Sequence, residues 1–337
     1  MKTHTKIYSQ ILLILGLLLS SFGAEAKQPT LQFNKNGKFK IVQLTDIHYV
    51  YQDKSSEKAL ERILKIIDLE EPDLIMVTGD LIFGKPGDKS MLTVMYALSS
   101  RKIPLAITYG NHDDEQGFSR EELLKLIKEV PYNLTSTTKN LSGVTNYLLE
   151  IKASDSKKTS AVFYVFDSHS YSQIKGIEGY DYIKLDQINW YRKTSQQFAK
   201  KNNNKPLFSL AFFHIPTPEF KEATLKVKDQ LKGNFKEDIC CPQLNSGLFS
   251  TIKEQDDIKG IFVGHDHDND FCTKWHNVLL AYGRYSGGET VYNNLTGNGA
   301  RIIEITEGKD DFKTWIRTLN GVSQIINYPS DFPEVIK

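Results

Sequence analysis

Short clusters of aspartate, asparagine and histidine recur along the chain, and each follows a run of apolar residues. They read Asp46-Ile47-His48, Gly79-Asp80, Gly110-Asn111-His112-Asp113, a single His214, and Gly264-His265-Asp266-His267. A single histidine or a Gly-Asp pair is weak evidence, because both occur in most proteins. Gly-Asn-His-Asp is much more specific, and five such clusters in this order are hard to obtain by chance.

Seven side chains in these clusters are candidate metal ligands. They are Asp46, His48, Asp80, Asn111, His214, His265 and His267. Carboxylate, amide and imidazole groups are hard or borderline ligands, which suit divalent ions. Seven ligands exceed the four that one tetrahedral zinc ion requires. Two ions that share a bridging carboxylate would use all seven, so we predict a dinuclear site.

The first half of the chain must position these clusters through alternating strands and helices. Hydrophobic periodicity predicts strands at residues 38–46, 74–78 and 103–108, and helices at residues 55–68, 91–98 and 119–130. Ser119 as N-cap and Glu122 three positions later are typical of a capping box. This alternation indicates parallel βαβ units. Because the carboxyl ends of such strands meet at one crevice, we expect the polar clusters to converge there.

The second half is richer in strands. We predict them at residues 146–151, 161–166, 207–213, 260–263, 278–281 and 301–305, with a helix at 186–200 and a weaker helix candidate at 245–254. A doubly wound single sheet would keep alternating with helices. We therefore predict an α/β fold with four layers, an α/β/β/α sandwich of two mixed β-sheets flanked by helices. No repeat or long linker divides the chain, so a single domain is expected over residues 27–337, with its core at about 38–305.

The first 26 residues have the layout of a secretory signal peptide. Lys2 and Lys6 precede the apolar run 11–19, and Ala24-Glu25-Ala26 has the form of a cleavage site. An uncleaved membrane anchor is the alternative, but the run is far shorter than the roughly 20 residues that span a bilayer. We therefore expect a secreted or periplasmic protein with no membrane span in the mature chain.

Composition bears on the possible partners of the chain, and its cysteine content bears on a possible disulfide. Lys+Arg 42 against Asp+Glu 41 gives a net charge of +1, so overall charge offers no argument for a nucleic-acid partner. An oxidising compartment would permit one disulfide. Adjacent cysteines rarely bridge each other, so Cys272 would pair with Cys240, or less favourably with Cys241. The alternative is three free, buried thiols.

The ordered series of clusters resembles the calcineurin-like metallophosphoesterase superfamily over about residues 38–301. Within it, segments 79–84 and 263–272 resemble the small single-domain branch related to purple acid phosphatases. Phe83 stands where the purple enzymes carry an iron-ligating tyrosine. Since Phe83 has no donor atom and His48 can supply the missing ligand, we expect two divalent ions (Mn, Fe or Zn) and no obligatory ferric iron.

The resemblance implies a secreted hydrolase of small phosphate esters. One ion would be held by Asp46, His48, Asp80 and His267, and the other by Asp80, Asn111, His214 and His265. A metal-bridging hydroxide would attack the ester, foremost a monoester. A phosphodiesterase acting on cyclic nucleotides or lipid head groups is the enzymatic alternative. A catalytically inactive, metal-bound binding protein is the other, and it predicts a lost ligand or a lost His112; neither is lost here.

The resemblance also assigns roles beyond the ligands. His112 would contact the substrate and protonate the leaving oxygen, and Asp113 would orient the His112 imidazole. Arg284, in the glycine-rich segment 282–288, is a candidate contact to the substrate phosphate. Asp266, Asp268 and Asp270 are expected to adjust the surroundings of the ligand histidines or their loop.

Overall fold

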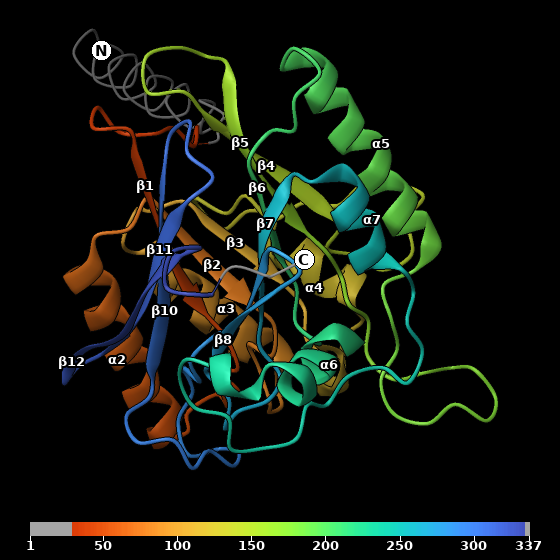
Figure 1. Cartoon of the computed structure of the whole chain (residues 1–337). Helices are drawn as coiled ribbons and strands as arrows, with labels where there is room; N and C mark the ends of the chain where they lie inside the picture. The colour runs from red at the N-terminus through yellow and green to blue at the C-terminus, as the bar shows by residue number, and fades with distance from the viewer. Residues whose placement is uncertain (1–28, 334–337) are drawn as a thin grey trace, which may run out of the picture.

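The computed structural model describes residues 29–333 and contains two β-sheets that lie face to face (Figure 1). The first three polar clusters follow strands of one sheet, and the last two follow strands of the other. The first sheet has the order β12-β11-β10-β1-β2-β3 and the second β4-β5-β6-β7-β9-β8. The N-terminal and C-terminal parts of the chain build the first sheet, and the middle builds the second.

Both sheets are mixed. The first contains β1 (Lys38–Leu44), β2 (Leu74–Thr78), β3 (Leu105–Thr108), β10 (Gly299–Thr306), β11 (Phe312–Thr318) and β12 (Gly321–Tyr328). The second contains β4 (Tyr147–Lys152), β5 (Thr159–Val165), β6 (Ser209–Phe212), β7 (Ile258–Val263), β8 (Cys272–Trp275) and β9 (Val278–Tyr282). β1, β2 and β3 are parallel, and so are β5, β6, β7 and β9, whereas β10 to β12, β4 and β8 pair antiparallel.

Helices cover the outer face of each sheet. α2 (Lys54–Glu70), α3 (Gly87–Ser99) and α4 (Arg120–Ile127) pack on the first sheet, and α5 (Leu185–Lys201), α6 (Pro218–Lys226) and α7 (Leu248–Gln255) pack on the second. Figure 1 shows α2 on one side of the molecule and α5 with α7 on the other. Short 3-10 turns, η1 (Asp113–Gln116) and η2 (Lys228–Gln230), lie in the connections.

Alternation along the strands divides the apolar side chains among three cores. In β2, Leu74 and Met76 face the core between the sheets, whereas Ile75 and Val77 face the helices. Successive side chains of a strand point to opposite faces, so each buried strand serves two cores at once. The predicted four-layer α/β/β/α sandwich is therefore confirmed.

The structure also adds elements that the sequence pattern did not predict. These are α6, β8, β11 and β12, and the last two extend the first sheet to Tyr328, beyond the predicted end of the core at about 305. The predicted capping box is present, since Ser119 Oγ accepts from the Glu122 N–H and the Glu122 carboxylate accepts from the Ser119 N–H. The predicted signal peptide lies outside the described residues. Within 29–333, none of the helices combines the length and apolar character needed to cross a bilayer.

Candidate metal centre

The seven predicted ligands all follow the carboxyl ends of strands, and the structure brings them together. Asp46 and His48 follow β1, Asp80 follows β2, Asn111 follows β3, His214 follows β6, and His265 and His267 follow β7. All seven are buried. Their His and Asp members form two groups, Asp46–His48–Asp80–His267 and Asp80–His214–His265, and in each group the ligand atoms lie within 4.8 Å of one another. Both sheets therefore contribute to one centre.

The first group is a cluster of two carboxylates and two imidazoles. His48 Nε2 lies 3.1 Å from His267 Nε2 and 3.5 Å from Asp80 Oδ2. Asp46 Oδ1 lies 3.9 Å from His48 Nε2 and 3.7 Å from His267 Nε2. Two carboxylate oxygens and two ring nitrogens thus surround one point, which suits a divalent cation.

The second group shares Asp80 with the first. Asp80 Oδ2 lies 3.2 Å from His214 Nε2, and the His214 and His265 ring centroids are 5.0 Å apart. Asp80 Oδ1 accepts a hydrogen bond from the His112 backbone N–H at 2.9 Å, which leaves Oδ2 directed toward both groups. Asn111 lies in the same loop, directly before His112. One carboxylate oxygen is therefore available to both groups.

Several ligand atoms are buried without a hydrogen-bond partner among residues 29–333. They are Asp80 Oδ2, Asn111 Oδ1, His214 Nε2 and His265 Nε2. A buried polar atom left unpaired costs about 1–3 kcal/mol, so four in one place require an explanation. A pair of metal ions explains all four, because each atom offers a lone pair suited to a cation once His214 has given up its Nε2 proton. The residues present therefore fit a dinuclear centre.

Backbone carbonyls fix the tautomers of two ligand histidines. His214 Nδ1 lies 2.8 Å from the Thr78 carbonyl oxygen, and His267 Nδ1 lies 2.9 Å from that of Tyr292. A carbonyl oxygen can only accept, so Nδ1 donates in both rings. When these rings are neutral, their Nε2 atoms carry the lone pairs that a metal needs.

The charges of the candidate ligands follow from their burial and from the charged side chains beside them. Burial lowers the pKa of His48 and of His265 well below the usual value, so both rings are neutral, as ligands must be. Burial opposes ionisation of Asp80, but the neighbouring imidazoles, His214 foremost, together outweigh it and hold the Asp80 pKa well below its usual value. Burial likewise opposes protonation of His214, but Asp80 raises its pKa to about 9. Metal binding must displace this His214 proton.

The ligand loops adopt left-handed backbone conformations. Asp46, His48, Asp80 and His265 have φ of 53°, 46°, 52° and 82°, a region that costs non-glycine residues free energy. Gly110 in the Gly-Asn-His cluster cannot be a larger residue, because a Cβ at this position would lie 2.1 Å from Asp80 Oδ1. The motif glycine thus permits the close approach of two ligand loops.

His112 lies beside the ligands, and its side chain is 29% exposed. Its ring centroid is 5.5 Å from that of His48, and Phe83 packs edge-on against both rings at 5.1 and 5.3 Å. The His112 Nδ1 atom lies 2.6 Å from Glu115 Oε2. The pattern had not singled out Glu115; its i,i+3 spacing from His112 on a short helical turn was the available signal.

The prediction that Asp113 orients the His112 imidazole is wrong. Asp113 is fully buried, and its carboxylate accepts hydrogen bonds from four backbone N–H groups instead. The four donors are Asp80, Leu81, Ile82 and Gly110, at 2.8 to 3.1 Å. Asp113 therefore holds the loop that carries Asp80 against the loop that carries Asn111.

The prediction that Arg284 contacts the substrate phosphate is not supported by its position. Arg284 is only 4% exposed and its Nη1 is paired with the Asp270 carboxylate. Nε and Nη2 donate to the Gly297 carbonyl at 3.0 and 2.7 Å, and Nη2 also donates to the Thr296 carbonyl. These acceptors occupy all three guanidinium nitrogens, so Arg284 braces the loop.

Asp266 and Asp268 fix the loops around the ligand histidines, as expected. Asp266 accepts from the Tyr282 hydroxyl at 2.5 Å and from the Cys240 backbone N–H. Asp268 accepts from the side-chain amide of Asn294 at 2.5 Å. Burial raises the pKa of Asp266 to about 7.

The predicted Cys240–Cys272 disulfide is absent, and all three cysteines are free. Cys272 opens β8 and is buried in the core between the two sheets. Cys241 packs against the core on the outer face of the second sheet, and Ile239 belongs to that same core. The Cys272 side chain thus points away from the segment that carries the other two thiols.

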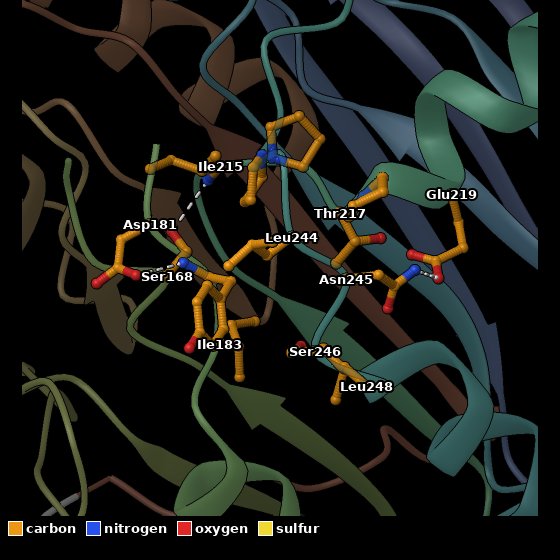
Figure 2. Close-up of a pocket in the computed structure, with 14 residues that line it drawn as sticks. Ser168, Asp181, Ile183, Ile215, Thr217, Glu219, Leu244, Asn245, Ser246 and Leu248 are labelled. Carbon is orange, nitrogen blue, oxygen red and sulfur yellow. Dashed lines mark hydrogen bonds between the residues drawn. The ribbon is translucent and has the colours of Figure 1, made fainter. Parts of the chain in front are cut away.

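The pocket in Figure 2 is separate from the metal centre. Ser168, Ile215, Thr217 and Asn245 are among its lining residues, and it includes none of the seven candidate ligands. Its volume of about 10 Å³ holds no more than a water molecule. It is therefore too small for an ester substrate.

The sequence matches a phosphoesterase family model and is similar to purple acid phosphatase-like proteins over most of its length. The family model described as calcineurin-like phosphoesterase matches residues 39–269. An Arabidopsis thaliana protein named "probable inactive purple acid phosphatase 29" is 36% identical, covering 92% of this chain and 87% of that one. "Phosphatase DCR2" of Saccharomyces cerevisiae is 32% identical over 89% of this chain and 57% of its own length.

Two solved structures share the fold at low sequence identity. A dimetal phosphatase from Danio rerio superposes with a TM-score of 0.62 and 13% identity, covering 86% of this chain and 98% of that chain. GAP50, described as the anchor in the inner membrane complex of Plasmodium, superposes with a TM-score of 0.53 and 13% identity, covering 86% and 88%.

Proposed function

Since the chain belongs to the calcineurin-like phosphoesterase family, we propose that it is a secreted enzyme that hydrolyses small phosphate esters, foremost monoesters, with two divalent metal ions. One ion would be held by Asp46, His48, Asp80 and His267, and the other by Asp80, Asn111, His214 and His265. When bound, two such ions supply an activated water nucleophile and neutralise the charge of the phosphoryl group.

The observation that carries the proposal is the set of four buried, unpaired ligand atoms around Asp80. Three of them belong to histidine or asparagine side chains from different strand ends, and the fourth is the shared carboxylate oxygen. Buried lone pairs without a hydrogen-bond donor fit a site that binds cations.

The chain itself supplies the acid. His112 Nδ1 is engaged by the Glu115 carboxylate, which leaves Nε2 to donate a proton to the leaving oxygen. Phe83 packs edge-on against both His48 and His112. In this arrangement His112 acts on the substrate without being a ligand.

Two alternatives remain to be separated from this proposal. A phosphodiesterase would use the same ligands, so geometry does not distinguish it. An inactive binding protein is suggested by the name of the Arabidopsis thaliana relative. The complete ligand set together with His112 supports activity in this chain.

The test is metal-stripped protein reloaded with Mn²⁺, Zn²⁺ or Fe²⁺ and assayed on 4-nitrophenyl phosphate and bis(4-nitrophenyl) phosphate. We expect hydrolysis of the monoester to exceed that of the diester. Asp80→Asn should lose both activity and calorimetric metal binding, whereas the matched control Asp68→Asn should retain both, because Asp68 is a partly exposed partner of Arg101. Metal binding without hydrolysis of either ester would favour the inactive binding protein.

A further inference from the structure

Hydrogen bonds join the predicted ligand Asn111 to the predicted acid His112 through two exposed side chains. Asn111 Nδ2 donates to the Tyr171 hydroxyl oxygen over 3.3 Å. The Tyr171 hydroxyl lies 3.2 Å from Glu115 Oε1, and Glu115 Oε2 lies 2.6 Å from His112 Nδ1. Because Asn111 and His112 are neighbours in the sequence, the four side chains form a closed network beside the metal centre.

The direction of each hydrogen bond in this network follows from Glu115. A carboxylate can only accept, so the Tyr171 hydroxyl must donate its single proton to Glu115 Oε1. With that proton engaged, the hydroxyl oxygen can only accept from Asn111, and the amide nitrogen must face it. At the other carboxylate oxygen, His112 Nδ1 must carry a proton in order to donate. One carboxylate therefore orders all four groups.

The orientation of the Asn111 amide decides whether Asn111 can be a ligand, because only the amide oxygen offers a lone pair to a cation. Asn111 Oδ1 is one of the four buried atoms that lack a hydrogen-bond partner in the described part of the chain. If the amide were rotated by half a turn, Oδ1 would face the Tyr171 hydroxyl and the NH₂ group would face the metal site. The Tyr171 hydroxyl opposes that rotation, since its proton is already given to Glu115.

The same carboxylate holds the His112 ring. The Nδ1 proton stays with Glu115, so Nε2 is the ring atom left to pass its proton to the leaving oxygen. The Glu115 side chain is 38% exposed and Tyr171 is 41% exposed, so neither side chain is needed to fill a core. Their polar contacts therefore indicate a role at the site rather than in packing.

We propose that Glu115 and Tyr171 are positioning residues that tie the metal ligand to the acid. Through Tyr171, Glu115 fixes which end of the Asn111 amide faces the metal site. Directly, Glu115 fixes which nitrogen of the His112 ring keeps its proton. The role of His112 in this inference rests on the proposed function. Outer partners of metal ligands contribute about 10- to 100-fold in metal affinity or activity, and we expect effects of that size.

The first test is a calorimetric titration of Mn²⁺ into the metal-stripped full chain. Tyr171→Phe removes only the hydroxyl that holds the Asn111 amide. We expect the affinity for one of the two ions to fall by about 10- to 100-fold and the affinity for the other to stay at the parent value. At saturating Mn²⁺ this variant should retain kcat, since the contact of Glu115 with His112 is intact. Tyr96→Phe is the matched control, because it removes the hydroxyl of a 52% exposed tyrosine on α3, and both of its affinities should equal those of the parent.

The second test follows the His112 ring by ¹⁵N NMR of the Zn²⁺-loaded protein, with His112→Asn to assign its signals. In the parent, Nδ1 should show the chemical shift of a protonated nitrogen. Glu115→Ala removes the acceptor, so this signal should move toward that of an unprotonated nitrogen, and kcat at saturating metal should fall by about 10- to 100-fold. Glu121→Ala is the matched control, because it removes an exposed carboxylate from the first turn of α4, and it should change neither readout.

These measurements separate the inference from the proposed function. Parent-like affinity for both ions in Tyr171→Phe, or a parent-like Nδ1 signal in Glu115→Ala, would overturn the inference. Neither of these readouts requires turnover. A parent that binds two ions and hydrolyses neither nitrophenyl ester would overturn the proposed function, and the loss of affinity in Tyr171→Phe would still support the positioning of Asn111.

Discussion

Replacing Asp113 with asparagine should destabilise the protein severely, although it changes none of the predicted ligand side chains. Oδ1 of this buried carboxylate accepts from the Leu81 and Ile82 N–H groups, and Oδ2 accepts from those of Asp80 and Gly110. Asp113→Asn turns one oxygen into an amide donor, so two of the four N–H groups lose their acceptor. At about 1–3 kcal/mol for each unpaired buried donor, we expect a loss of about 2–6 kcal/mol.

The assay is urea unfolding with a chelator present, so that metal binding does not contribute to the free energy of unfolding. It should be run at about pH 8, because burial raises the pKa of Asp113 to about 7. Asp114→Asn is the matched control. Asp114 is the next residue of η1, its side chain is 34% exposed, and it pairs with Arg120 at 3.4 Å. The control should lose no more than about 1 kcal/mol.

The outcome also separates the two roles considered for Asp113. If this carboxylate braced the backbone only weakly and instead oriented His112, Asp113→Asn would lower kcat while its unfolding free energy matched that of Asp114→Asn. That result would refute the assignment of Asp113 to the Asp80 loop.

Three further predictions address catalysis, the loop and acid stability. His112→Asn should retain both metals by metal analysis, yet lose on the order of 10²–10⁴ in kcat, with a larger loss on alkyl than on aryl phosphates because alkoxides need a proton; an equal loss on both esters would contradict its role as the acid. Arg284→Met should lower the free energy of unfolding by about 3 kcal/mol, because it leaves the buried Asp270 carboxylate without its cationic partner. A raised KM at unchanged stability would instead indicate that Arg284 contacts the substrate. Burial opposes ionisation of Asp167, but Arg120 and backbone N–H groups hold its pKa below the ordinary 3.8. The contribution of Asp167 to the free energy of unfolding is therefore full above pH 3.8 and is lost as the pH falls toward the pKa of the folded protein. Denaturant unfolding should therefore show a smaller loss of stability in that acid range for Asp167→Asn than for the parent or the exposed-site control Asp155→Asn.

The fold and the meeting of the ligands were predictable because both depend on short-range patterns. Apolar runs that end in Asp, Asn or His identify strand ends, and parallel strands bring their carboxyl ends to one edge. β12 escaped prediction because it is the edge strand of the first sheet and only Ile326 and Tyr328 of its residues are buried. A strand with few buried residues carries little hydrophobic signal. β11 lies beside it and alternates buried with less buried residues from Phe312, a pattern that the prediction missed.

The contacts of individual side chains were harder to predict because they depend on local geometry between distant segments. Glu115 reaches His112 only because η1 turns helically. Arg284 is buried since the loops of Asp270 and Gly297 close around it. Cys272 faces the inner core through its position in β8, and a shift of one residue would have turned it to the other face.

The ligands come from both sheets, and this has a thermodynamic consequence. β1, β2 and β3 lead to Asp46, His48, Asp80 and Asn111, whereas β6 and β7 lead to the three remaining histidines. Separating the sheets would therefore release the ions, so metal binding and the folding of the whole sandwich are linked. Each ion contributes about 2.7 kcal/mol when its free concentration is 100 times its Kd. The melting temperature of this protein should accordingly rise with free metal concentration, and metal scarcity would limit how long the folded chain persists as well as its turnover.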